Sequence, residues 1–359
     1  MRIFLGVLGV LALVGVAFAC LSIYARKEIN KPKFEMPEAP EVSAVSPLPA
    51  TGPEAYDYVN ALFTASLNAD DVELSEHTSI RLTGDGRETP FSDADNGLFA
   101  RALEQAQGKI SGMFTAVENE PVARIKDLPT LGFTAAQVTD FTAEKGVTDE
   151  NGETNDDGFY YISFTVEPTA VDTAAMLDSE VKAGVLKELE PMLSVSSAQI
   201  IPESFTAKFK IRYADDSLER IELKQNVTVN ATVEFKDDYK AVSGETSSLK
   251  LPLEKTVSID FFRYGLRFVE RQTALQTGRT LALPLEVRVN SETTKDDYTI
   301  TYTVSQDGVL DIDADGVMEV VGASEQPVTV TAVLEYDGHT YSDSMTVYAT
   351  DLEVKTDER

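Results

Sequence analysis

Alternating carboxylates in the segment DIDADG are the residues whose spacing comes nearest to a recognisable chemistry. Asp311, Asp313 and Asp315 precede Gly316, as the first ligands of a calcium loop would. Such a loop carries glutamate at its twelfth position, where this chain has Gly322, and its flanks here read as strands rather than helices. The sequence therefore predicts a solvated turn, with no metal site.

Two serine–lysine pairs have the S-x-x-K spacing of a nucleophile with its base. They are Ser179 with Lys182 and Ser247 with Lys250, and the S-D-N and K-T-G signatures that accompany such a pair in β-lactamases do not occur. No Walker A, G-x-G-x-x-G, G-x-S-x-G or paired-cysteine motif is present, and the two histidines, His77 and His339, read as incidental surface residues. We therefore predict a non-enzymatic protein, with no catalytic, cofactor-binding or metal-ligating residues and no cofactor.

The charge balance excludes nucleic acid as a partner. Sixty Asp and Glu oppose 31 Lys and Arg, giving a net charge of -29, and such a surface repels phosphate backbones and anionic lipid headgroups. One basic strand face, made by Lys208, Lys210 and Arg212, is expected to pair across a hairpin with Glu219 and Glu222.

The N-terminal 25 residues form a membrane anchor or signal segment. Residues 3 to 25 carry no charge, and at ~1.5 Å per residue they would span roughly 34 Å as a helix, enough to cross a bilayer. The only cysteine, Cys20, leaves three alternatives open: a lipidated residue, the first residue after an Ala-x-Ala cleavage site, or part of an uncleaved helix. The apolar continuation through Ala25 favours the uncleaved helix.

The flanking charges oppose the orientation that we expect. Arg26, Lys27, Lys31 and Lys33 outnumber Arg2 and the α-amine, so the positive-inside rule would place the following domains in the cytosol. The predicted fold of the C-terminal part, described below, outweighs this count of flanking positive charges. We expect a single-pass protein of the cell membrane with its domains on the extracytoplasmic side.

A proline-rich linker, residues 26–54, follows the anchor. Six prolines between positions 32 and 53 predict an extended, semi-rigid stalk that lifts the next domain off the membrane.

Residues 55–265 are predicted to form an α+β domain. Apolar spacing indicates helices from Tyr56 to Leu67, from Ser92 or Asp93 to Ile110, and from Asp172 to Leu193. Strict alternation in FYYISFTVE, SFTAKFKIRY, NVTVNATVEF and TVSIDFF indicates antiparallel strands with one covered face.

Residues 266–352 consist of short predicted strands separated by Gly and Asp turns, and residues 353–359 form a polar tail. The segments LQTGRTLALPLEV, TVSQDGVLDIDADGVMEVVG, VTVTAVLEYDG and SMTVYAT resemble the bacterial Ig-like group 2 domain. The resemblance implies a β-sandwich used for display, spacing or adhesion at a bacterial surface, and no chemistry. We expect residues 267–352 to fold alone.

The helix-then-strand order of the middle domain is also similar, at the level of fold alone, to half-barrel lipoprotein carriers of the bacterial envelope. The fold class is thus an α+β antiparallel-sheet domain followed by an all-β Ig-like sandwich, with an N-terminal membrane helix. The expected function is display, adhesion, or protein or glycan binding at the cell surface through the Ig-like domain. The alternative is a carrier or sensor that holds an apolar ligand between the sheet and helices of the middle domain.

Overall fold

The computed structural model describes residues 33–38, 43–83, 115–148, 154–191, 193–236, 246–290 and 293–355. The chain divides into two compact units, a middle unit over Glu41–Tyr264 and a C-terminal unit made of Met1–Pro40 with Gly265–Arg359. The predicted membrane segment and the predicted helix near Ser92 lie outside the described residues. Within the described ranges, no helix is long and apolar enough to cross a membrane.

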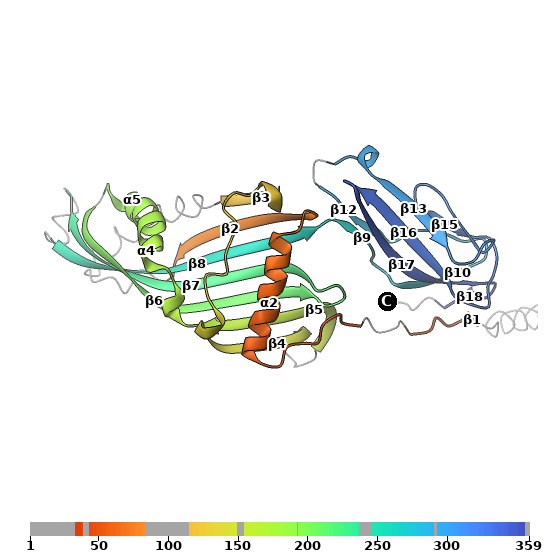
Figure 1. Cartoon of the computed structure of the whole chain (residues 1–359), viewed down its shortest axis with the longest axis horizontal. Helices are drawn as coiled ribbons and strands as arrows, with labels where there is room; N and C mark the ends of the chain where they lie inside the picture. The colour runs from red at the N-terminus through yellow and green to blue at the C-terminus, as the bar shows by residue number, and fades with distance from the viewer. Residues whose placement is uncertain are drawn as a thin grey trace, which may run out of the picture. The chain divides into compact units, whose positions relative to one another are not determined.

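A single antiparallel sheet forms the middle unit and confirms the predicted antiparallel domain (Figure 1). Its strands run in the order β3-β2-β8-β7-β6-β5-β4. Their bounds are β2 (Val72–Leu82), β3 (Thr115–Pro121), β4 (Val138–Thr148), β5 (Thr154–Val166), β6 (Leu193–Arg212), β7 (Ser217–Phe235) and β8 (Thr246–Arg263).

Alternation sets the register of this sheet. Phe209 of β6 pairs with Ile221 of β7, which pairs with Ile259 of β8, and all three side chains are at most 2% exposed. Their neighbours on the same strands, Lys208, Glu222 and Ser258, pair on the opposite face. A one-residue slip would exchange the two faces, so the buried set fixes the pairing.

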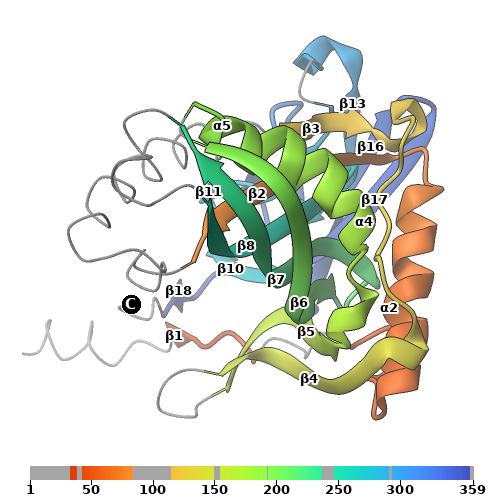
Figure 2. The same ribbon diagram turned by 90° about the vertical axis from the view of Figure 1, so that its left-hand side faces the viewer.

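Two helical segments cover the apolar face, as the edge-on view shows (Figure 2). Helix α2 (Gly52–Leu67) is capped by Thr51, whose hydroxyl accepts a hydrogen bond from the amide of Glu54 at 3.4 Å. The second segment consists of α4 (Thr173–Met176), a π-helical stretch η4 (Leu177–Leu186) and α5 (Lys187–Leu189). Asp172 caps it by accepting from the amide of Ala175 at 3.0 Å. The apolar spacing predicted a helix here but did not reveal the π geometry, which is rare over such a length.

A loop that the sequence analysis did not assign completes the core. It contains the short helices η1 (Val122–Arg124) and η2 (Ala135–Gln137), with a further turn, η3 (Pro168–Ala170), after β5. Phe133 from this loop stacks edge-on with Phe164 and Phe205, with ring centroids 6.1 and 5.6 Å apart. The hydroxyl of Tyr56 in α2 donates to the carbonyl of Phe133 at 3.1 Å. Phe133 and Tyr56 therefore pack together between α2 and the sheet.

Over its described residues, the C-terminal unit is all strand and turn apart from η5 (Lys295–Asp297). One sheet has the order β10-β17-β16-β13, another has the order β11-β15-β14, and β9 pairs with β12. The bounds are β9 (Gly265–Phe268), β10 (Gln272–Gln276), β11 (Thr280–Ala282), β12 (Leu285–Arg288), β13 (Thr299–Val304), β14 (Leu310–Ile312), β15 (Val317–Val320), β16 (Val328–Tyr336) and β17 (His339–Thr350).

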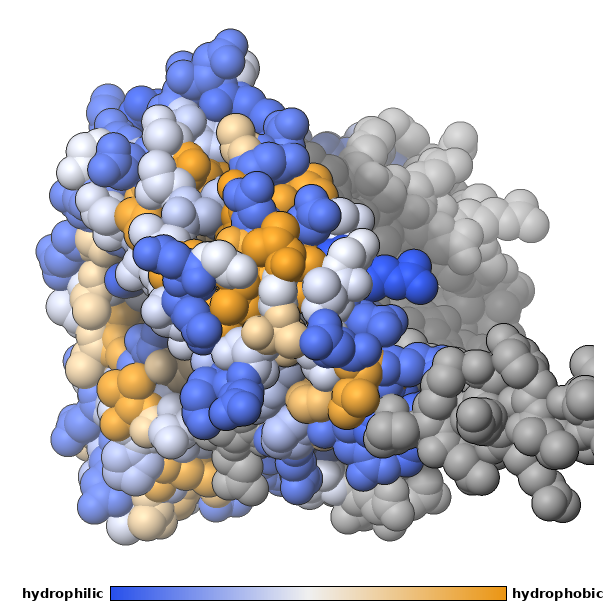
Figure 3. Space-filling view, turned by 90° about the vertical axis from the view of Figure 1, so that its right-hand side faces the viewer, coloured by the Kyte–Doolittle hydropathy of each residue, from blue (hydrophilic) through white to orange (hydrophobic). Residues whose placement is uncertain are grey.

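These sheets share one hydrophobic core. Met318 and Val320 from β15 lie in the same buried cluster as Val330 from β16 and Val347 from β17. On the outside, Val269, Val317 and Val321 remain exposed. The space-filling view shows one face of the molecule on which apolar residues gather among hydrophilic ones (Figure 3).

The described parts of the proline-rich linker are extended, but they are not free of the two units. Residues 33–34 form strand β1 (Lys33–Phe34), which pairs in parallel with β18 (Glu353–Val354) in the C-terminal unit. In the middle unit, the amide of Val45 donates to the carbonyl of Tyr213 at 2.9 Å, and Leu48 packs against the core. Helix α2 begins at Gly52, before the predicted end of the linker.

Candidate binding site

A two-residue turn between β16 and β17 forms one wall of the candidate site. Asp337 and Gly338 have φ angles of +49° and +78°, and Tyr336 pairs with His339 across them. Positive φ at both central positions is the geometry that matches the twist of a hairpin, and Asp-Gly is a preferred sequence for it. The turn thus places Asp337 at the tip of the hairpin, between Tyr336 and His339.

The chain before β13 forms the opposite wall. Thr294 and Asp297 make a capping box at η5, in which the carboxylate of Asp297 accepts from the Thr294 amide at 2.8 Å and from its hydroxyl at 2.7 Å. These hydrogen bonds lower the pKa of Asp297. The hydroxyl of Tyr336 accepts from the amide of Asn290 at 3.3 Å and lies 2.8 Å from the hydroxyl of Thr293. Tyr336 therefore holds this segment against the end of β16.

Between the two walls lies an open, mostly polar hollow of about 350 Å³. Thr299 and Glu335, which both line it, are direct partners on β13 and β16. The residues that line it are Asp296, Asp297, Tyr298, Thr299, Glu335, Tyr336, Asp337, Gly338, His339 and Thr340. Four carboxylates and two tyrosines stand in this set without a lysine or arginine, so the hollow suits a partner with cationic or hydroxyl groups.

A second polar cluster, in the middle unit, holds the linker in place. The hydroxyl of Tyr58 donates to Asp216 at 2.8 Å, the hydroxyl of Ser46 donates to the same carboxylate, and Tyr160 donates to the carbonyl of Ser46 at 3.1 Å. Burial, the hydrogen bond to Asp216 and its negative charge raise the pKa of Tyr58 above its ordinary range. These tyrosines stay protonated at neutral pH and act as hydrogen-bond donors.

The cluster continues through Tyr213. Its hydroxyl lies 2.8 and 2.9 Å from the two carboxylate oxygens of Asp156, and the ammonium of Lys145 lies 2.8 Å from that carboxylate. Burial alone would raise the pKa of Asp156, but hydrogen bonds from Lys145 and Tyr213 outweigh it, so the pKa is lowered. Each tyrosine hydroxyl in this cluster donates to an acceptor. Such paired groups stabilise a fold.

A third group of charges lies on the apolar face of the middle sheet. Lys255 of β8 forms an ion pair with Glu180 of the π-helical stretch. Burial raises the pKa of the nearby Glu76, and the positive charge of Lys255 opposes that shift. This ion pair attaches the helical segment to the sheet.

The residues first considered for chemistry turn out to have structural partners. One carboxylate oxygen of Asp313 accepts from the amides of Asp315 at 3.0 Å and Val317 at 2.9 Å, which closes a turn. Over the described residues, no cluster of His, Cys, Asp or Glu is arranged to hold a metal ion.

In the first serine–lysine pair, each side chain bonds a different partner. Ser179 donates to the carbonyl of Ala175 at 2.7 Å, while Lys182 pairs with Asp178 at 2.6 Å. The side chain of Ser247 and the whole of Cys20 lie outside the described residues.

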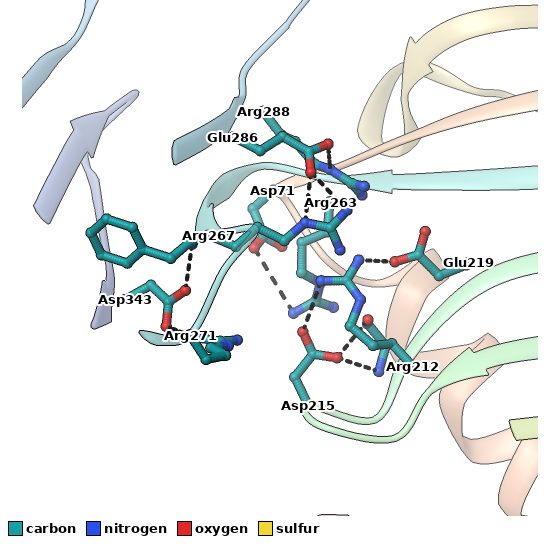
Figure 4. A network of polar contacts seen from close by, with 12 residues as sticks. Asp71, Arg212, Asp215, Glu219, Arg263, Arg267, Arg271, Glu286, Arg288 and Asp343 are labelled. Carbon is teal, nitrogen blue, oxygen red and sulfur yellow. Dashed lines mark hydrogen bonds and ion pairs between the residues drawn. The ribbon is translucent and has the colours of Figure 1, made fainter. Parts of the chain in front are cut away.

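Two of the three residues of the basic strand face pair with carboxylates as expected, whereas Lys210 stands opposite Arg220 and lies 3.9 Å from the ring centroid of Phe159. Lys208 lies 3.9 Å from Glu222. Arg212 bonds Glu219 and lies 3.5 Å from Asp215 (Figure 4). In the C-terminal unit, the same figure shows Arg267 and Arg288 on Glu286 and Arg271 on Asp343. These basic groups are therefore engaged within the fold.

The binding hollow was not predicted. The Asp and Gly of YDGH belong to the turns predicted between the short strands, but the sequence does not show that residues 296–299 approach this turn. His339, interpreted as an incidental surface residue, is half-buried in its wall. No protein-family model matches this chain, and no curated protein matches it either.

Proposed function

We propose that this chain is a membrane-tethered, extracytoplasmic protein that acts by binding, without catalysis, through its C-terminal unit. The observation that carries the proposal is the acidic hollow at the β16–β17 hairpin, with its four carboxylates and two tyrosines. The strands of this unit follow the segments that resemble the bacterial Ig-like group 2 domain, which supports a role in display or adhesion. The uncharged N-terminal run supports tethering.

The negative charge of the hollow determines which kind of partner it attracts. Asp296, Glu335 and Asp337 are exposed, and the whole chain adds a net charge of -29, so the field attracts basic groups and repels acidic ones. Tyrosine rings at the wall can stack on a guanidinium or cover an aliphatic stem. We therefore propose a lysine- or arginine-bearing segment of another protein at the cell surface as the ligand.

Binding of an arginine- and lysine-rich peptide to the purified chain tests this proposal. The variant Asp296→Asn with Glu335→Gln and Asp337→Asn should weaken binding roughly tenfold, because each exposed charge pair contributes about 0.5 kcal/mol. Raising the salt concentration should weaken wild-type binding as well.

A matched variant removes the same charge elsewhere on the unit. Asp307, Asp311 and Glu319 are exposed and lie outside the hollow, so their amide substitutions should leave affinity nearly unchanged. Equal losses in both variants would show non-specific attraction to an acidic protein. Binding of a neutral oligosaccharide in place of the peptide would contradict the basic partner and indicate a glycan.

A further inference from the structure

The linker segment that follows the predicted membrane helix is built into the C-terminal unit. Lys33 and Phe34 form β1, in parallel register with Glu353 and Val354 of β18, and the amide of Lys355 donates to the carbonyl of Phe34 at 3.1 Å. The first described residues of the chain and the last ones thus share a strand pair.

Side chains strengthen this attachment on both sides of the pair. Lys33 lies 3.3 Å from Glu353, and Lys355 forms an ion pair with Glu35. The rings of Phe34 and Tyr348 have centroids 5.7 Å apart.

A buried amide holds the end of the segment. The side-chain nitrogen of Gln272 in β10 donates to the carbonyl of Pro37 at 2.7 Å, and Gln272 is only 9% exposed. A buried amide that loses its partner carries a desolvation cost, so this contact favours a docked linker over a free one.

We propose that residues 33–38 dock the C-terminal unit close to the membrane, so that this unit, although last in sequence, is tethered directly to the anchor. The inference rests on the proposed membrane tether. Only the seven residues 26 to 32 separate the apolar run from the docked strand, and seven residues reach at most ~25 Å. An acidic binding unit is thereby held near the surface without adhering to anionic headgroups.

A disulfide trap tests the docking itself in the full-length chain. In a Cys20→Ser background, Lys33→Cys with Glu353→Cys should form an intramolecular disulfide under mild oxidation, because these residues are register partners. The control pair is Lys33→Cys with Glu335→Cys, since Glu335 pairs with Thr340 near the start of β17 while β18 follows the end of that strand. Crosslinking of the control to the same extent, or no crosslink at 33 and 353, would overturn the docking.

Energy transfer from a dye on the C-terminal unit to labelled lipid headgroups tests the distance. The dye is placed on Asp311→Cys in the Cys20→Ser chain, reconstituted in lipid nanodiscs. A flexible insert of about twelve Gly and Ser residues between positions 30 and 31 should reduce the transfer, because it lengthens the tether. The same insert between positions 40 and 41 should leave it unchanged, because it lies beyond the docked segment.

The outcomes separate this inference from the proposed function. A similar loss with both inserts would show that the C-terminal unit hangs at the far end of a free stalk, contradicting the inference. A chain that never associates with lipid would refute the membrane tether, while the disulfide trap would still decide whether residues 33–38 dock.

Discussion

Tyrosine hydroxyls donate several of the side-chain hydrogen bonds in the middle unit. Tyr161, for example, donates to Asp157 at 2.6 Å on the sheet surface. Burial, together with this hydrogen bond and the charge of Asp157, raises the pKa of Tyr161 to about 12. Such a group couples the stability of the fold to alkaline pH.

We predict that Tyr161 contributes to alkaline destabilisation. An unfolded tyrosine loses its proton near pH ~10, whereas the folded one retains it up to about 12. The folded state therefore binds more protons in this window, and the free energy of unfolding falls as pH rises through it. Tyr161→Phe and Asp157→Asn should each flatten this fall, measured by denaturant unfolding from pH 9 to 12. If the free energy of unfolding falls as steeply with pH in both variants as in the wild type, Tyr161 does not cause the alkaline destabilisation.

Gly146 and Gly158 form a matched pair at the residue scale. Both have positive φ, +76° and +89°, but a Cβ at Gly146 would collide with the carbonyl oxygen of Asn155, whereas one at Gly158 would meet nothing within 4 Å. Gly158→Ala should cost about 1 kcal/mol from φ alone, and Gly146→Ala clearly more because β4 and β5 must move apart. If chemical denaturation shows the same loss in the free energy of unfolding for both substitutions, the bulge between Lys145 and Val147 shifts to accommodate the added Cβ without further cost.

At the scale of elements, strand alternation predicted β5 to β8 and helical apolar spacing predicted α2, because each element carries its own periodic signal. The loop that contains Phe133 carries no period, so its role in the core appears only when Phe164, Phe205 and Phe209 converge on one face. The hollow of the C-terminal unit escaped prediction for the same reason. Its walls come from residues nearly forty positions apart, and their meeting depends on the β13–β16 register.

Phe133 should be one of the most stabilising residues of the middle unit. It is 6% exposed, and Phe133→Ala should cost about 3–5 kcal/mol in the free energy of unfolding, since it leaves a cavity among aromatic rings. Leu128→Ala in the same loop is the control, because Leu128 is 42% exposed and surface changes usually stay within about 0.5 kcal/mol. A small effect at both positions would mean that the loop is not part of the core.

At the scale of the whole molecule, the chain combines two separate cores with a linker attached to each. The charge count and the apolar N-terminal run could be read from composition alone. The docking of residues 33–38 could not, because a parallel pair of two-residue strands more than 300 positions apart leaves no local pattern. An autonomous fragment of residues 267–352 would lack both strands of that pair.

The central claim is that these units work outside the cytoplasm on a membrane tether, and protease accessibility tests it most directly. Intact, wall-stripped cells that produce the chain with a C-terminal tag are treated with protease, and the tag is followed by immunoblot beside a cytoplasmic protein as control. We predict complete loss of the tag while the control remains intact. Survival of the tag until the cells are lysed would place both units in the cytosol, as the basic residues at 26, 27, 31 and 33 would require, and would contradict the account.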